Sequence, residues 1–116
     1  MSSFNLSEAF KALSDENRVT VLRTLMDGEL CAAEILQKLN ITQPTLSHHM
    51  KTLCESGLVK SRKQGKWTYY SVNDKAANKI LKFIKDVFSI ELLEVTNETA
   101  AKSTAAPKKD LPSHLL

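Results

Sequence analysis

Short polar and basic side chains are concentrated in two neighbouring stretches of the chain. Residues 42–51 read TQPTLSHHMK, and residues 58–66 read LVKSRKQGK. Hydroxyl, amide and imidazole groups exchange hydrogen bonds with base edges, whereas lysine and arginine pair with phosphates. The residue types in these two stretches therefore favour contact with a nucleic acid over chemistry on a small substrate.

The first stretch is predicted to be a capped helix. Thr42 carries a good N-cap hydroxyl, and Pro44 falls in the first turn, where a missing N–H causes no loss. The inner stripe consists of Leu46, Met50, Leu53 and Gly57. The outward positions are Gln43, Thr45, Ser47, His48 and Lys51. We expect the first four outward side chains to read base edges in the major groove and the lysine to contact a phosphate.

The second stretch is predicted to be one strand of a β-hairpin. Residues 58–64 and 67–72 are rich in strand-forming types, and Gly65-Lys66 between them suits a two-residue turn. The predicted phosphate contacts of this hairpin are Arg62, Lys63 and Lys66. A helix for the major groove and a hairpin for the backbone are the two elements with which a winged helix-turn-helix holds DNA.

Size and composition set the class of protein. The chain has 116 residues, which suits one domain, and 42% of them are hydrophobic. Its net charge is a modest +3, so the clustering of cations in the hairpin is more informative than the total. No apolar run approaches the roughly 20 residues that cross a bilayer. The first residues do not resemble a signal peptide, so we expect a cytoplasmic protein without membrane contact.

An enzyme is not expected. The acids, histidines and two cysteines form no recognisable triad, paired carboxylate site or phosphate-binding loop. The adjacent imidazoles of His48 and His49 point in different directions on a helix and cannot chelate one ion together. We expect His48 to face DNA and His49 to flank the inner side of the helix.

Further helices are predicted around these elements, over about residues 6–13, 16–26 and 32–39. Their expected core residues are Leu6, Ala9, Phe10, Leu13, Val19, Leu22, Leu25, Met26, Ala32, Ile35, Leu36 and Leu39. A long helix from Asp74 to about Leu93 carries two apolar stripes, and a small domain buries only one of them. The surplus stripe is expected to pack on a second subunit. We predict one DNA-binding and dimerisation domain over residues 1–95 and a flexible tail over residues 96–116.

Three local motifs occur in order along the chain. They are Ala12-Leu13-Ser14-Asp15 with Arg18, then Gln43 to Leu53 continuing through Glu55-Ser56-Gly57-Leu58-Val59, and then Gly65-Lys66-Trp67-Thr68-Tyr69-Tyr70. In this order and spacing they resemble the ArsR/SmtB family of bacterial transcriptional repressors, over about residues 6–93. The resemblance implies a mainly helical winged helix-turn-helix with a small hairpin, in the order α-α-α-α-β-β-α. It also implies a homodimer, joined through the first and last helices, that binds a double-stranded DNA operator and is released by an inducer.

The inducer is where the sequence departs from the family pattern. Metal sensors of this family commonly place a Cys-x-Cys pair after Glu-Leu in the third helix. Here Cys31 follows Glu29-Leu30, but Ala33 stands at the second ligand position. The family's other common site uses Asp and His on the last helix, which here contains no His. Cys31 is therefore the one candidate metal ligand, and a single thiolate is a poor soft-metal site unless further ligands come from elsewhere.

Several interpretations remain open. A soft metal ion or a thiol-reactive signal acts through Cys31, since the start of a helix favours a thiolate. Alternatively, the inducer is not a metal, or there is none. A third interpretation is a protein-interaction module that keeps the winged fold and has lost DNA binding. Cys54 is expected to pack beside the inner stripe, and a disulfide with Cys31 depends on a distance that the sequence does not give.

Overall fold

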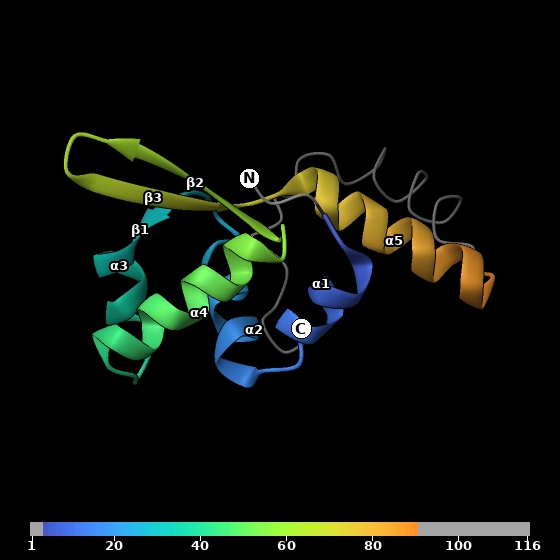
Figure 1. Ribbon diagram of the computed structural model, residues 1–116, viewed down its shortest axis with the longest axis horizontal. Coiled ribbons are helices and arrows are strands. Elements are labelled where there is room, and N and C mark those ends of the chain that lie inside the picture. Colours follow the sequence, from blue (N-terminus) through green and yellow to red (C-terminus); the bar gives the residue numbers. More distant parts are fainter. Residues whose placement is uncertain (1–3, 91–116) are drawn as a thin grey trace, which may run out of the picture. The chain divides into compact units, whose positions relative to one another are not determined.

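The computed structural model describes residues 4–90 (Figure 1). Its elements are α1 (Leu6–Ala12), α2 (Glu16–Thr24), β1 (Leu30–Cys31), α3 (Ala32–Gln37), α4 (Gln43–Glu55), β2 (Val59–Gln64), β3 (Trp67–Val72) and α5 (Asp74–Phe88). Helices α3 and α4 with their turn form the helix-turn-helix, and the β2–β3 hairpin forms the wing. The predicted mainly helical winged helix-turn-helix is confirmed.

Side-chain caps define where the principal helices begin. The Asp15 carboxylate accepts from the backbone N–H of Asn17 at 2.8 Å and caps α2. The Thr42 hydroxyl accepts from the N–H of Thr45 at 3.4 Å and caps α4, with Pro44 in the first turn. The Thr42 cap was predicted from residue type, and Asp15 acts in the same way, because a polar oxygen satisfies N–H groups that the helix itself leaves unpaired.

The core is centred on the inner face of α4. Leu46, Met50 and Leu53 are buried as predicted, and Gly57 follows them into the interior. Val21 of α2 and Ile35 of α3 are fully buried in the same core. Because this apolar stripe faces inward, the remaining arc of α4 is presented to solvent.

Three residues expected in the core lie at the surface instead. Ala32 is exposed, because it is the first residue of α3 and the buried position of that helix is Ile35. Phe10 is exposed, because Ala9 and Ala12 form the buried face of α1. Met26 is exposed, because α2 ends at Thr24 and the chain beyond it no longer follows helical spacing. The buried position on α2 belongs to Val21, which the sequence prediction missed.

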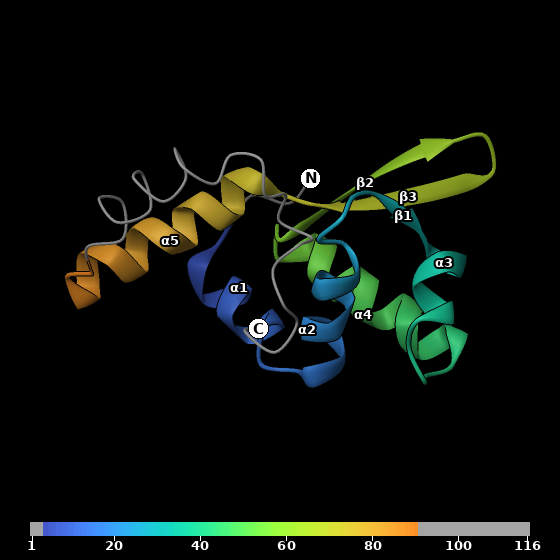
Figure 2. The ribbon, with the colours of Figure 1, turned by 180° about the vertical axis from the view of Figure 1, so that it is seen from behind.

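The wing follows the predicted hairpin. Strands β2 and β3 pair antiparallel from Val59 opposite Val72 to Gln64 opposite Trp67. Gly65 occupies the turn with a φ of +65°, a left-handed conformation that glycine adopts without steric cost. Both ribbon views show the tip of the wing extending past α3 (Figures 1 and 2).

One strand was not predicted. Strand β1 pairs antiparallel with the other edge of β3, with Leu30 opposite Tyr70 and Cys31 opposite Tyr69, so the strand order is β1-β3-β2. A strand of two residues shows no periodicity in the sequence, so it is recognised only by its pairing. Its consequence is that the segment before α3 is hydrogen-bonded directly to the wing.

The last helix ends earlier than predicted. Helix α5 stops at Phe88, and Ser89 has a φ of 53°, whereas the sequence suggested a helix to about Leu93. The chain forms two compact units, one up to Lys79 and one from Ile80, so their boundary falls within α5. No helix within residues 4–90 has the length and apolar character to span a bilayer. The tail predicted over residues 96–116 lies outside the described residues.

Candidate nucleic-acid interface

The outward face of α4 carries all the side chains that the sequence predicted there. The exposed residues are Gln43, Thr45, Ser47, His48 and Lys51. They cover the arc of the helix that the apolar stripe leaves free. The Thr42 hydroxyl also donates to Thr45 Oγ1 at 2.9 Å, so the cap of the helix orients one of these side chains. Short polar groups with one cation at the edge suit the floor and wall of a DNA major groove.

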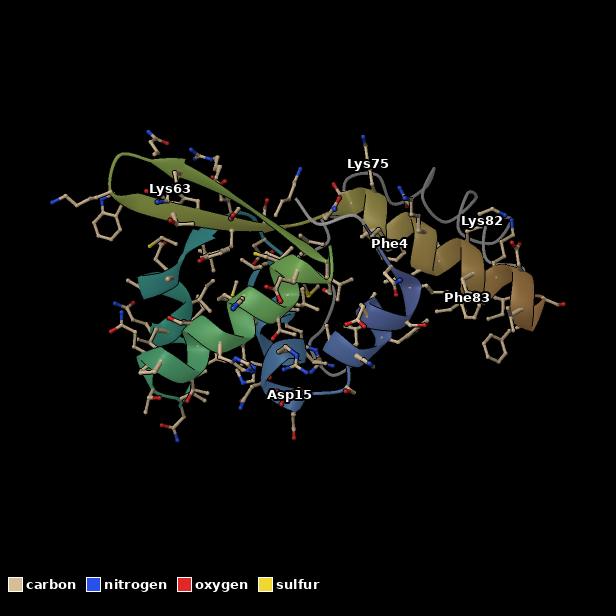
Figure 3. All side chains as sticks on the ribbon, in the orientation of Figure 1. Phe4, Asp15, Lys63, Lys75, Lys82 and Phe83 are labelled. Carbon is tan, nitrogen blue, oxygen red and sulfur yellow. The ribbon has the colours of Figure 1, made fainter. Side chains whose placement is uncertain are left out.

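Two of the three cations predicted to contact phosphates from the wing are exposed lysines. Lys63 lies on β2 and Lys66 in the turn, and both are exposed. Figure 3 shows Lys63 on the hairpin. An exposed ammonium group is a strongly hydrated point charge that pairs with a phosphate without demanding one geometry.

Arg62, the third predicted cation of the wing, is already engaged within the protein. Its Nε and Nη2 donate to the Glu29 carboxylate at 2.7 and 2.8 Å, and Nη1 donates to Gln64 Oε1 at 2.7 Å. The guanidinium also lies 4.9 Å from the centroid of the Tyr69 ring. The hydrogen bonds from Arg62 lower the pKa of Glu29. Contact of Arg62 with a phosphate therefore stays a prediction and would compete with Glu29.

A hollow of about 390 Å³ lies between the helix-turn-helix and the wing. Its lining includes Gln43 and Ser47 from α4 and Lys66 and Trp67 from the wing. Residues predicted separately from two stretches of sequence thus border one concave surface. The Trp67 side chain is 52% exposed there. Sequence reasoning gave it no DNA-binding role, because a strand aromatic more commonly packs on its neighbours.

Cys31 takes part in the hydrogen bonding at the start of α3. It is 8% exposed and is the N-cap of α3, where its backbone N–H donates to the Glu34 carboxylate at 2.9 Å in a capping box. That hydrogen bond lowers the pKa of Glu34. Within residues 4–90, no three His, Cys, Asp or Glu side chains lie close enough together to hold a metal ion. The donor set of one described chain therefore does not fit a soft metal.

Cys54 is half-buried beside the inner stripe of α4. Burial raises the pKa of this thiol, so the neutral form predominates at neutral pH. Neither Cys54 nor Cys31 is disulfide-bonded in this structure.

The geometry defines a class of protein: a winged helix-turn-helix that presents a polar recognition helix and a basic wing to DNA. Comparison with known proteins gives the family. Residues 15–61 match the family model described as bacterial regulatory protein, arsR family. An uncharacterized HTH-type transcriptional regulator of Methanocaldococcus jannaschii is 37% identical over 82 residues, which are 70% of this chain and 92% of that protein. The arsenical resistance operon repressor of Staphylococcus aureus is 47% identical over 73 residues, 63% of this chain and 70% of that protein.

Solved structures agree with the sequence relatives. An ArsR-like transcriptional regulator from Rhodococcus sp. RHA1 has a TM-score of 0.67 at 26% identity, with 89% of this chain and 93% of that chain covered. The transcriptional repressor BigR from Xylella fastidiosa has a TM-score of 0.56 at 32% identity, with coverage of 74% and 88%. The chain belongs to the ArsR family of bacterial regulatory proteins. It is a DNA-binding transcriptional regulator and not an enzyme.

Proposed function

We propose that this regulator is a cytoplasmic repressor that binds one specific operator through α4 and the wing. The observation that carries the proposal is the hollow that places Gln43 and Ser47 of α4 beside Lys66 of the wing. One duplex can meet base-reading and phosphate-binding side chains together at such a surface. Relatives named as operon repressors support repression as the outcome of binding.

Each predicted residue has one task in this proposal. The base-reading residues are Gln43, Thr45, Ser47 and His48. The phosphate-contacting residues are Lys51, Arg62, Lys63 and Lys66. The first group lies on the exposed arc of α4, and the second group lies at its edge and on the wing. This division predicts different consequences for specificity and for general affinity.

The repressor is proposed to act as a homodimer through its first and last helices, within a domain that extends over residues 1–95. The support is the apolar surface of α5, where the large side chains Leu81, Val87 and Phe88 are exposed. Two-fold symmetry of the protein would match a palindromic operator. Sedimentation of the full chain tests this: a species of twice the chain mass is expected, and a monomer at concentrations that saturate DNA contradicts it.

Two proposals compete for the inducer. A thiol-reactive signal at Cys31 is supported by relatives that are named for arsenical and cadmium resistance. An inducer that uses no metal is supported by Ala33 at the second ligand position and by the lack of a donor cluster within residues 4–90. The Cys31→Ser variant separates them. If arsenite, cadmium or a mild oxidant releases DNA from the wild type and equally from this variant, the first proposal is wrong.

The experiment that tests the main proposal is fluorescence anisotropy on the DNA just upstream of the chain's own gene. The titration is repeated at several salt concentrations and with random DNA of equal length. We expect tight binding that weakens with salt and prefers the upstream DNA. Absence of binding to either DNA would favour the interaction module instead.

A further inference from the structure

The recognition helix has a buried polar contact on the side that faces away from DNA. His49 is 6% exposed, whereas its neighbour His48 is exposed on the outward face. The Nδ1 atom of His49 lies 3.2 Å from Nη1 of Arg18 on α2. Buried polar groups are normally hydrogen-bonded, and a hydrogen bond restricts direction in a way that apolar packing does not.

Arg18 connects three helices through this contact. Its Nε donates to the backbone carbonyl of Ala12 at 2.8 Å, and its Nη2 donates to that of Lys11 at 3.3 Å. These carbonyls belong to the last turn of α1, where helix carbonyls lack partners within the helix. One side chain from α2 therefore holds the end of α1 with two nitrogens and the recognition helix with the third.

The contact also determines which tautomer His49 adopts. Arginine is always a donor, so His49 Nδ1 must accept and the ring proton of a neutral imidazole must lie on Nε2. His49 Nε2 then faces Asp15 Oδ1 at 3.9 Å. Asp15 is the N-cap of α2, and Figure 3 shows it at the start of that helix. Both ring nitrogens of His49 are thus directed at the junction of α1 and α2.

We propose that His49 and Arg18 are positioning residues for DNA recognition. Neutral His49 sets the rotation of α4 about its own axis, and this rotation aims Gln43, Ser47 and His48 at base edges. The apolar stripe alone tolerates small rotations, because hydrophobic packing has no preferred direction. Base reading does not tolerate them, since a recognition site has to be held to about 0.5 Å. The inference rests on the proposed function, because it concerns how operator DNA is distinguished.

Protonation of His49 would break this contact. Ionisable groups close to the ring include Arg18 and Asp15 from the α2 side and His48, whose ring centroid is 6.0 Å away. A proton on Nδ1 removes the acceptor and places a second positive charge beside Arg18. The pKa of Asp15 is lowered, chiefly by the hydrogen bond from the Arg18 backbone N–H, so this carboxylate stays charged, but it lies nearest Nε2 and does not restore the acceptor that Nδ1 loses. Acid is therefore expected to reduce operator preference.

The test compares His49→Asn, which keeps an acceptor near the position of Nδ1, with His49→Leu, which keeps the volume and has no acceptor. Anisotropy gives the ratio of affinities for upstream and random DNA. In His49→Leu we expect the ratio of affinities to fall about tenfold, which is equivalent to the loss of one base contact. Affinity for random DNA is expected to stay within about twofold, because the lysines are unchanged. His49→Asn is expected to retain most of the preference.

A pH series over about pH 5 to 8 provides the second measurement. The preference of the wild type is expected to fall in acid more than that of His49→Asn. Both proteins contain His48, so the difference isolates His49. If circular dichroism shows that His49→Leu is unfolded, the inference is decided by comparing the pH dependence of the wild type with that of His49→Asn. Identical pH profiles would overturn the inference.

The tautomer is measured independently of DNA. Long-range ¹H–¹⁵N spectra of the wild-type histidine rings are expected to show the His49 proton on Nε2, and a neutral ring protonated on Nδ1 would overturn the inference. A wild type that binds upstream DNA specifically, with His49→Leu equally specific, overturns the positioning while the proposed function stands. A wild type without any preference for the upstream DNA removes the proposed function and this inference with it.

Discussion

Helix α4 and the wing are both proposed to contact DNA, but they are held in different ways. Helix α4 is anchored along its length by buried apolar residues and, at His49, by a buried hydrogen bond to α2. The wing is a two-stranded hairpin, and its strand β2 is almost entirely exposed. Arg62 on β2 forms an ion pair with Glu29, which comes just before β1 in the chain. The difference indicates that α4 is fixed by side chains in the core, whereas the wing is fixed by backbone pairing of β3 with β1 and β2 and leaves its cations at the surface.

The largest effect is expected from breaking the anchor of the helix. Leu53→Ala removes a fully buried side chain of α4 and should lower the free energy of unfolding by about 2–5 kcal/mol. Denaturant unfolding followed by circular dichroism measures this. Met26→Ala is the matched control, because it truncates an exposed apolar side chain and should change stability by about 0.5 kcal/mol or less. Equal losses in the two variants would contradict the placement of the core.

The next effect separates base reading from phosphate contact. Ser47→Ala and His48→Ala should each cost about 1–3 kcal/mol of binding to upstream DNA and little of binding to random DNA. Lys63→Ala should weaken both equally and reduce the slope of log affinity against log salt by about 1. Lys75→Ala, at the start of α5, is the control for losing a cation outside the predicted interface. Equal losses on both DNAs in all three interface variants would refute the division of tasks.

A smaller effect is expected from removing Asp15, the N-cap of α2. Asp15→Ala should destabilise the protein by about 1 kcal/mol, because the first N–H groups of α2 lose their acceptor. The folded-state pKa of Asp15 is lowered, so its contribution is present above the unfolded-state pKa and is lost as pH falls through the folded-state value. The stability difference between wild type and variant should therefore shrink in acid. A difference that grows as pH falls would contradict the lowered pKa.

The smallest effect is expected from breaking the ion pair between Glu29 and Arg62 of the wing. Glu29→Gln removes the carboxylate that holds Arg62 and raises the net charge near the wing by one, because a negative charge is lost. The ion pair is solvent-exposed, so stability should change little. Affinity for random DNA at low salt should rise, because Arg62 becomes available to phosphates. Weaker binding would mean that the Glu29 contact positions the wing rather than neutralising it.

Local features of the chain were well predicted. Helix α4 was recognised because its cap, first-turn proline and apolar spacing agree, and the hairpin because glycine marks its turn. Contacts between distant segments were not predicted. Arg62 and Glu29 are 33 positions apart, and Arg18 and His49 are 31 apart. The pairing of β1 with β3 also joins segments that are distant in the sequence. In addition, a strand of two residues shows no periodic pattern from which it could be predicted.

The sequence by itself determined the principal helices, the two strands of the wing and the polar face of α4, because caps, turns and periodicity act over a few residues. Only the tertiary structure decided that Arg62 is engaged by Glu29, that His49 is held by Arg18, and that Trp67 borders a hollow with Gln43. These outcomes depend on which side chains meet after the helices pack. The energy of such contacts is set by distance in space, and no local pattern of residues encodes that distance.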